Sequence, residues 1–118
     1  KTLLCTDSLA IAGTDIKEGV MSGTEFIVEE GVCKLKDRSA FAGSIATADR
    51  LMRVMTKEYG YDIVTAVKMI TKTPAKIAKI NAGSIEKGKR ADIIVFDEDI
   101  TIENVFVNGL NVSASTPL

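Results

Sequence analysis

Apolar positions in this chain form short runs of strand length in some stretches and follow helical spacing in others. The first run, Leu3-Leu4-Cys5, stops at Asp7, and small residues follow over 8–14. The pattern predicts a buried strand that carries Asp7 at its C-terminal tip, where parallel α/β barrels present catalytic groups. Aspartate is also frequent in turns and helix caps, so a plain turn residue is the alternative reading of Asp7.

Four later runs also read as strands. Residues 25–28 and 32–35 flank the turn Glu29-Glu30-Gly31, which predicts a hairpin because glycine accepts a positive φ. Near the C-terminus, the β-branched run within 91–97 is followed by a second run at 102–107. Asn108-Gly109 then predicts a tight turn into a return strand at 110–112.

Helical spacing lies between these two groups of strands. A helix is expected from Ser44, with Ser44 or Thr47 as its cap, and a second helix after a capping Asp62. Thr73-Pro74 predicts the start of a third helix, and residues 81–83 its end. The order of elements indicates an α/β chain that divides near Gly83, into 1–83 and an all-strand part, 84–118.

Composition excludes several classes of function. The 118 residues carry 15 basic and 16 acidic side chains, and no basic face favours nucleic acid. No apolar stretch has the length of a membrane span and no signal peptide is visible, so we expect a cytoplasmic protein with no membrane partner. The chain contains no histidine, which excludes a Ser–His or Cys–His nucleophile pair. Cys5 and Cys33 are expected to be buried thiols.

Other charged groups have ordinary structural explanations. The basic turn Lys87–Arg90 lacks a following helix N-terminus, so a turn is favoured over a phosphate site. Asp92 is expected to accept hydrogen bonds from backbone N–H groups of a turn. The other grouped carboxylates are expected in a solvated turn and at strand ends, with no acid–base pair among them: Glu29, Glu30, Asp97, Glu98 and Asp99.

Three stretches carry a resemblance to a known family. They are residues 4–13 with Thr6-Asp7-Ser8 and Ala12-Gly13; Gly31-Val32-Cys33 with Phe41-Ala42-Gly43-Ser44; and Thr73-Pro74-Ala75 with the motif at 83–95. In this order they resemble the C-terminal part of the N-acetylglucosamine-6-phosphate deacetylase family, within the amidohydrolase superfamily. The resemblance covers nearly all of the chain, which begins with Lys and reads as part of something longer.

The resemblance implies a fold and a set of roles. Residues 1–83 would be the C-terminal end of a catalytic (β/α)8 barrel, with its last strand, a hairpin and about three helices. Residues 84–118 would be strands of a small β-sandwich domain. Asp7 would take a proton from metal-bound water and pass one to the leaving amine. Phe41, Ala42 and Gly43 would form a loop beside the sugar, or else only a strand-to-helix turn. The divalent metal, zinc or similar, would have its ligands largely outside this chain, with none assigned here.

The expected activity is hydrolysis of N-acetylglucosamine 6-phosphate, an amino-sugar phosphate, to glucosamine 6-phosphate and acetate. The isolated 118 residues are expected to be inactive, and unpaired strand edges favour a homo-oligomer. One alternative is another amidohydrolase, dihydroorotase-like or imidazolonepropionase-like, since the motif at 83–95 fits those too. The other alternative is a non-catalytic folding or assembly module in which Asp7 is an incidental turn residue.

Overall fold

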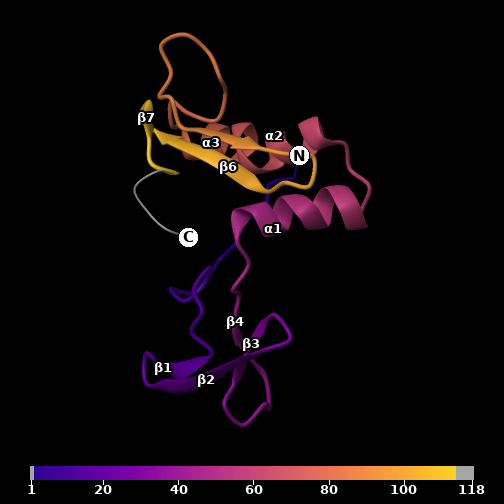
Figure 1. Ribbon diagram of the computed structural model, residues 1–118, viewed down its shortest axis with the longest axis vertical. Helices are drawn as coiled ribbons and strands as arrows, with labels where there is room; N and C mark the ends of the chain where they lie inside the picture. The colour runs from indigo at the N-terminus through magenta and orange to yellow at the C-terminus, as the bar shows by residue number, and fades with distance from the viewer. Residues whose placement is uncertain (1, 114–118) are drawn as a thin grey trace. The chain divides into compact units, whose positions relative to one another are not determined.

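The computed structural model describes residues 2–113, which divide into two compact units (Figure 1). One unit comprises residues 5–48, and the other comprises 2–4 together with 49–113. Each is built around an antiparallel sheet, of four strands in the first and three in the second. None of the helices within residues 2–113 is long and apolar enough to cross a membrane.

The unit of residues 5–48 is a meander of four strands in the order β1-β2-β3-β4 (Figure 1). The predicted hairpin is confirmed as β2 (Thr24–Glu29) and β3 (Val32–Leu35), with Glu30 at φ 51° and Gly31 at φ 75° in the turn. Two short edge strands, β1 (Glu18–Met21) and β4 (Phe41–Gly43), were not predicted. Both are brief and interrupted or ended by glycine, so their sequences lack a clear period of two.

Alternation along the hairpin buries one face of this sheet. Phe26 and Cys33 are 3% and 1% exposed, and in the antiparallel register Val28 lies opposite Cys33 and Leu35 opposite Phe26. Gly19 in β1 pairs with Phe26, and a Cβ there would lie 3.2 Å from the Phe26 ring. The expectation that Cys33 is a buried thiol is therefore confirmed, whereas Cys5 is exposed.

The second unit packs helices with the C-terminal strands. Helix α1 (Ala48–Arg53) continues into the π-helical turn η1 (Val54–Glu58), and α2 (Ile63–Ile70) and α3 (Lys72–Ala78) follow. Its core joins Met52 of α1, Ala66 of α2 and Ile100 of the loop before the last hairpin, and partly buried apolar side chains surround them: Met55, Val67, Ile70 and Phe96.

Of the two caps predicted for the first helix, Thr47 stands directly before it and Ser44 does not, and the predicted start of the third helix is wrong. The first helix begins at Ala48, directly after Thr47, because Ser44 is engaged in pairing with Ser8. The third begins at Lys72 rather than at Thr73-Pro74, so Pro74 stands third in the helix, still within the first turn where its missing N–H is not needed. The Asp62 cap is confirmed, since its carboxylate accepts the Thr65 N–H at 2.9 Å.

The C-terminal strands follow the sequence closely. Strands β5 (Ile93–Phe96), β6 (Ile102–Val107) and β7 (Leu110–Asn111) form the predicted antiparallel sheet. Asp92 was expected to anchor the basic turn that precedes it, but its carboxylate instead accepts the N–H of Asn108, in the turn between β6 and β7, at 2.9 Å. The basic stretch Lys87–Arg90 is a turn, closed by the Lys89 N–H on the Glu86 carbonyl at 3.1 Å.

The predicted buried strand before Asp7 is not formed. Residues 2–7 join no sheet, and Leu3 and Cys5 are exposed. A strand exists only where a neighbour supplies its hydrogen bonds, and the Leu4 N–H instead donates to the Met69 carbonyl at 3.0 Å. The proposed division at Gly83 concerns the parts of a larger fold and stays a prediction; the compact units themselves separate near residues 4 and 48.

Candidate functional site

Asp7 stands at the end of the extended N-terminal segment in an unusual backbone conformation. Its φ is 45°, in the left-handed region that costs most L-residues about 1–2 kcal/mol and that Asp and Asn visit more easily than others. The side chain is exposed, and no hydrogen bond or ion pair reaches its carboxylate from residues 2–113. Among these residues, the Asp7 carboxylate is thus open to solvent.

The residues that follow Asp7 are held against the segment after β4. Ser8 forms a parallel bridge with Ser44, and the Leu9 N–H donates to the Ser44 carbonyl at 2.9 Å. The Ser8 hydroxyl donates to the Ala46 carbonyl, and the Ala46 N–H donates to Ser44 Oγ at 3.1 Å. We call these contacts of Ser8 and Leu9 with Ser44 and Ala46 the Ser8–Ser44 clasp.

The clasp places the predicted substrate segment beside the residues that follow Asp7. Phe41, Ala42 and Gly43 form the edge strand β4, and Phe41 is 75% exposed. Gly43 directly precedes Ser44 and lies so close to Leu9 that a Cβ would fall 2.8 Å from Leu9 Cδ1. Two stretches that are 34 residues apart in sequence, from Asp7 to Phe41, are thereby joined at one edge of the sheet.

Sequence reasoning did not identify Ser8 and Leu9 as members of this arrangement. Ser44 was expected to cap a helix, and its pairing with Ser8 was not foreseen. The one available signal was Gly43, whose lack of a side chain indicated a close approach, although to a sugar and not to Leu9. Pairing between distant segments leaves no local pattern in a single sequence.

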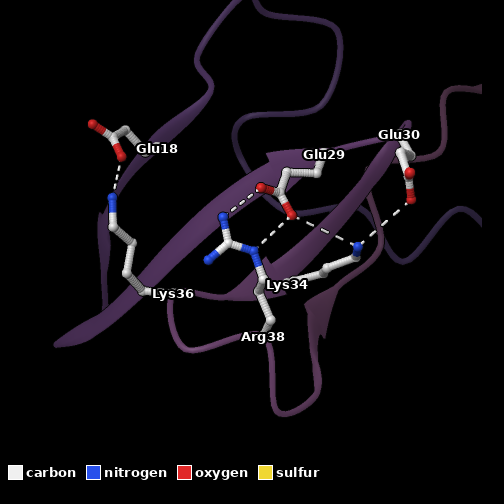
Figure 2. Close-up of polar contacts among 6 residues, drawn as sticks. All are labelled: Glu18, Glu29, Glu30, Lys34, Lys36 and Arg38. Atoms are coloured by element: carbon white, nitrogen blue, oxygen red, sulfur yellow. Dashed lines mark hydrogen bonds and ion pairs between the residues drawn. The ribbon is translucent and has the colours of Figure 1, made fainter.

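Carboxylates on the sheet of the same unit are engaged by basic side chains (Figure 2). Arg38 holds Glu29 through two nitrogens, at 2.6 and 3.1 Å, and these hydrogen bonds lower the pKa of the Glu29 carboxyl. Lys34 lies 3.7 Å from Glu29 and 3.8 Å from Glu30. Lys36 pairs with Glu18 and lowers its pKa through a hydrogen bond. Glu29 and Glu30 were expected in a solvated turn, and the ion pairs that they form with basic side chains were not predicted.

Basic side chains of the C-terminal turn are paired in the same way. Lys89 contacts Ser84 Oγ and lies 3.5 Å from Glu86, and Arg90 pairs with Asp92. Hydrogen bonding from Asn108 N–H, and then from Arg90, lowers the pKa of Asp92. Their partners lie in the same turn or the adjoining hairpin, which supports the structural explanation of this cluster over a phosphate site.

Each of the two units has a hollow, and Asp7 lines neither of them. One of about 330 Å³ in the unit of residues 5–48 is lined by Ile11, Gly13, Thr14, Ile16, Lys17, Val28, Glu30, Gly31 and Ile45. Another of about 450 Å³ lies in the second unit, between η1 and the loop after β5. Neither includes Asp7 or residues 41–43. Within residues 2–113, no group of three or more His, Cys, Asp or Glu side chains could hold a metal ion. The metal implied by the resemblance does not fit a site made by these residues alone.

Comparison with known proteins gives the family. The sequence matches the amidohydrolase family over residues 2–112. The chain belongs to the amidohydrolase family. Such a match over almost the whole chain confirms the superfamily expected from residues 4–13, 41–44 and 83–95.

Individual amidohydrolases align with most of this chain. The N-acetylglucosamine-6-phosphate deacetylase of Caenorhabditis elegans is 30% identical over 93% of it, and an adenine deaminase of Methanosphaera stadtmanae is 35% identical over 76%. The chain spans only 27% and 16% of the lengths of these two relatives. The similarity therefore covers less than a third of each relative.

Solved structures of amidohydrolases agree with the fold. The N-acetylglucosamine-6-phosphate deacetylase of Pasteurella multocida matches with a TM-score of 0.84 and 29% identity, covering 91% of this chain and 28% of its own. A mutant of the Mycobacterium smegmatis deacetylase, in complex with N-acetyl-D-glucosamine-6-phosphate, matches with a TM-score of 0.82 and 25% identity, covering 93% of this chain and 30% of its own. The fold described above is thus part of an amidohydrolase fold of the deacetylase kind.

Proposed function

We propose that this amidohydrolase chain is part of an enzyme that hydrolyses N-acetylglucosamine 6-phosphate to glucosamine 6-phosphate and acetate, with Asp7 as its proton-transferring carboxylate. The observation that carries the proposal is the Ser8–Ser44 clasp, because it joins the residues that follow Asp7 to the segment Phe41–Gly43. The likeness to deacetylase structures over 91–93% of the chain supports this substrate class.

The chemistry asks one carboxylate to move protons in two directions. In amide hydrolysis the water oxygen bonds to the acetamide carbonyl carbon, the C–N bond breaks, and the amine nitrogen leaves with an added proton. A carboxylate near the carbonyl can accept the proton from water and return it to nitrogen, and such catalysis contributes roughly 10²- to 10⁴-fold. Asp7 suits this role because its carboxylate is exposed and unpaired among residues 2–113, unlike Glu29, which Arg38 holds.

The segment Phe41–Gly43 is proposed to contact the sugar. Phe41 is exposed in the edge strand β4, which among residues 2–113 pairs with β3 alone. An aromatic ring can pack against the apolar face of a sugar ring, and polar backbone groups of an edge strand can hydrogen-bond to its hydroxyl and acetamide groups. We also propose that the whole enzyme uses a divalent metal and forms a homo-oligomer. In the whole enzyme, residues 1–83 would belong to the barrel and residues 84–118 to the β-sandwich.

The test replaces Asp7 by asparagine in the full-length gene product that contains this chain. Asparagine keeps the size of the side chain and also tolerates the left-handed φ, so the backbone is undisturbed while proton transfer is lost. We expect acetate release to fall by about 10²-fold or more with an unchanged melting temperature. The matched control is Asp15→Asn, an exposed carboxylate that likewise has no partner among residues 2–113.

Two results would count against the proposal. An Asp7→Asn enzyme within about tenfold of the wild-type kcat would remove Asp7 from the chemistry. A change in stability without loss of turnover would support the folding-module alternative. The isolated 118 residues are expected to release no acetate, and activity of that chain free of full-length enzyme would contradict the proposed division of the site.

One other activity has a specific observation in its favour. The 35% identity to an adenine deaminase makes hydrolytic deamination of a purine the second candidate. Both reactions add water and break a C–N bond, so a substrate panel separates them. The intact protein is assayed for acetate release from N-acetylglucosamine 6-phosphate and its galacto epimer, and for ammonia release from adenine. Ammonia release with no acetate release would replace the proposed substrate.

A further inference from the structure

The backbone at Asp7 is not stabilised by contacts of its own. Its left-handed φ of 45° is unfavourable for an L-residue, and among residues 2–113 nothing hydrogen-bonds to its carboxylate. A conformation of this kind persists only where the surrounding structure fixes it, and such positions cluster at functional sites. The contacts that fix it must therefore lie in the neighbouring residues.

Ser8 and Leu9, directly after Asp7, supply those contacts. Ser8 bridges Ser44 through its backbone and its hydroxyl donates to the Ala46 carbonyl, while the Leu9 N–H donates to the Ser44 carbonyl at 2.9 Å. On the opposite segment, the Ala46 N–H donates to Ser44 Oγ at 3.1 Å, which orders the residues that receive Ser8. All of these atoms belong to the unit of residues 5–48.

The Ser8 hydroxyl is the part of the clasp that depends on side-chain identity at this position. Alanine would keep the backbone bridge but lose the bond to Ala46, whereas threonine would keep the hydroxyl. Gly43 adds a steric limit on the same side, since Leu9 fills the space where its Cβ would be. These contacts anchor the backbone directly after Asp7.

We infer that Ser8 is a positioning residue for Asp7, holding the carboxylate in place through its hydrogen bond to Ala46 and its pairing with Ser44. The inference rests on the proposed deacetylase function and adds a second residue to the same site. Ser8 is argued to act through Asp7 and not to take part in bond breaking itself.

The experiment measures kcat and KM for acetate release with the full-length gene product. Ser8→Ala is expected to lower kcat about 10- to 100-fold with KM within about twofold of wild type, since displacing a catalytic group by about 1 Å costs on that order. Ser8→Thr is expected to restore most of kcat. The matched control is Thr14→Ala, which loses a hydroxyl bond to the Ile11 carbonyl, at 2.8 Å in the same loop, without touching the clasp.

A second variant covers the case in which Ser8→Ala does not fold. Ser44→Ala keeps Ser8 and removes only the oxygen that accepts the Ala46 N–H, and it is expected to lower kcat in the same direction. The melting temperature of every variant is measured, because a purely structural role would lower it while leaving kcat unchanged.

The outcomes separate this inference from the proposed function. A wild-type protein that releases acetate, together with Ser8→Ala and Ser44→Ala enzymes whose kcat equals that of Thr14→Ala, would overturn the inference and leave the function standing. Failure of threonine to restore kcat in a folded Ser8→Thr enzyme would overturn it as well. A wild-type protein that releases no acetate would overturn both.

Discussion

Gly83 is the position at which the structure predicts the largest effect of adding a single methyl group. Its φ is 79°, and a Cβ built there would lie 2.6 Å from the Thr71 carbonyl oxygen and 2.8 Å from the Ala75 Cβ. That carbonyl accepts the Ala75 N–H at 3.1 Å, at the start of α3. The Thr71 carbonyl oxygen cannot move away from a new methyl group at position 83 without disturbing its hydrogen bond to the Ala75 N–H.

The expected cost of Gly83→Ala has two parts. The left-handed φ costs an alanine about 1–2 kcal/mol. Forcing a methyl group into a filled space adds about 1–3 kcal/mol. The free energy of unfolding is therefore expected to fall by about 2–5 kcal/mol, a large share of the roughly 5–15 kcal/mol available to a domain.

A matched control isolates the steric part. Gly88 has a similar φ of 87°, and a Cβ there would meet nothing within 4 Å. Gly88→Ala is expected to cost only the conformational part, about 1–2 kcal/mol. Urea unfolding followed by circular dichroism gives both values, with equal m-values showing that only stability has changed. Equal midpoints for the two variants would refute the argument from the Thr71 carbonyl.

Two further substitutions test the caps and the core. Asp62→Ala removes the acceptor of the Thr65 N–H and should lower the melting temperature by a few degrees, whereas Asp62→Asn keeps the cap. Hydrogen bonds from the Thr65 side chain and then from its N–H lower the pKa of Asp62 in the folded state, so their stabilisation is present above the unfolded pKa and is lost as pH falls below about 4. Acid unfolding should therefore shift less with pH in Asp62→Asn than in wild type, and an identical shift would contradict the assignment. Met52→Ala, at a side chain that is 5% exposed in the core with Ala66 and Ile100, should cost about 2–5 kcal/mol in urea unfolding, and a loss below about 1 kcal/mol would show that the site collapses around the change.

Elements fixed by neighbouring residues could be predicted from the sequence. Gly31, Asn108 and Gly109 adopt the positive φ values that glycine and asparagine accept, and each of the two turns joins a pair of antiparallel strands. The Asp62 cap is equally local, because donor and acceptor are three residues apart. In these cases the physical cause and the sequence signal occupy the same few residues.

Elements that depend on distant partners were mispredicted. Residues 3–5 have the composition of a buried strand, but no strand of residues 2–113 pairs with them, and Leu3 is 39% exposed. Ser44 has the chemistry of a helix cap, but Ser8 competes for it from 36 residues away and the helix starts at Ala48. Thr73 was predicted to cap the third helix, but it lies inside that helix, which begins at Lys72. For residues 3–5 and for Ser44, local propensity was overridden by pairing that the local sequence does not encode.

Gly43 shows how the candidate site itself escapes prediction. The absence of a side chain at Gly43 indicated a close approach to its backbone. Because of the family resemblance, the sugar of the substrate was predicted to make that approach. In the structure the Leu9 side chain occupies that space, with Cδ1 2.8 Å from where a Cβ would stand. Packing of Leu9 therefore explains the glycine without a ligand. The exposed ring of Phe41 remains the proposed contact to the sugar. What Gly43 supports instead is the close packing of the residues after Asp7 against the end of β4, which is the contact on which both the proposed chemistry of Asp7 and the role of Ser8 depend.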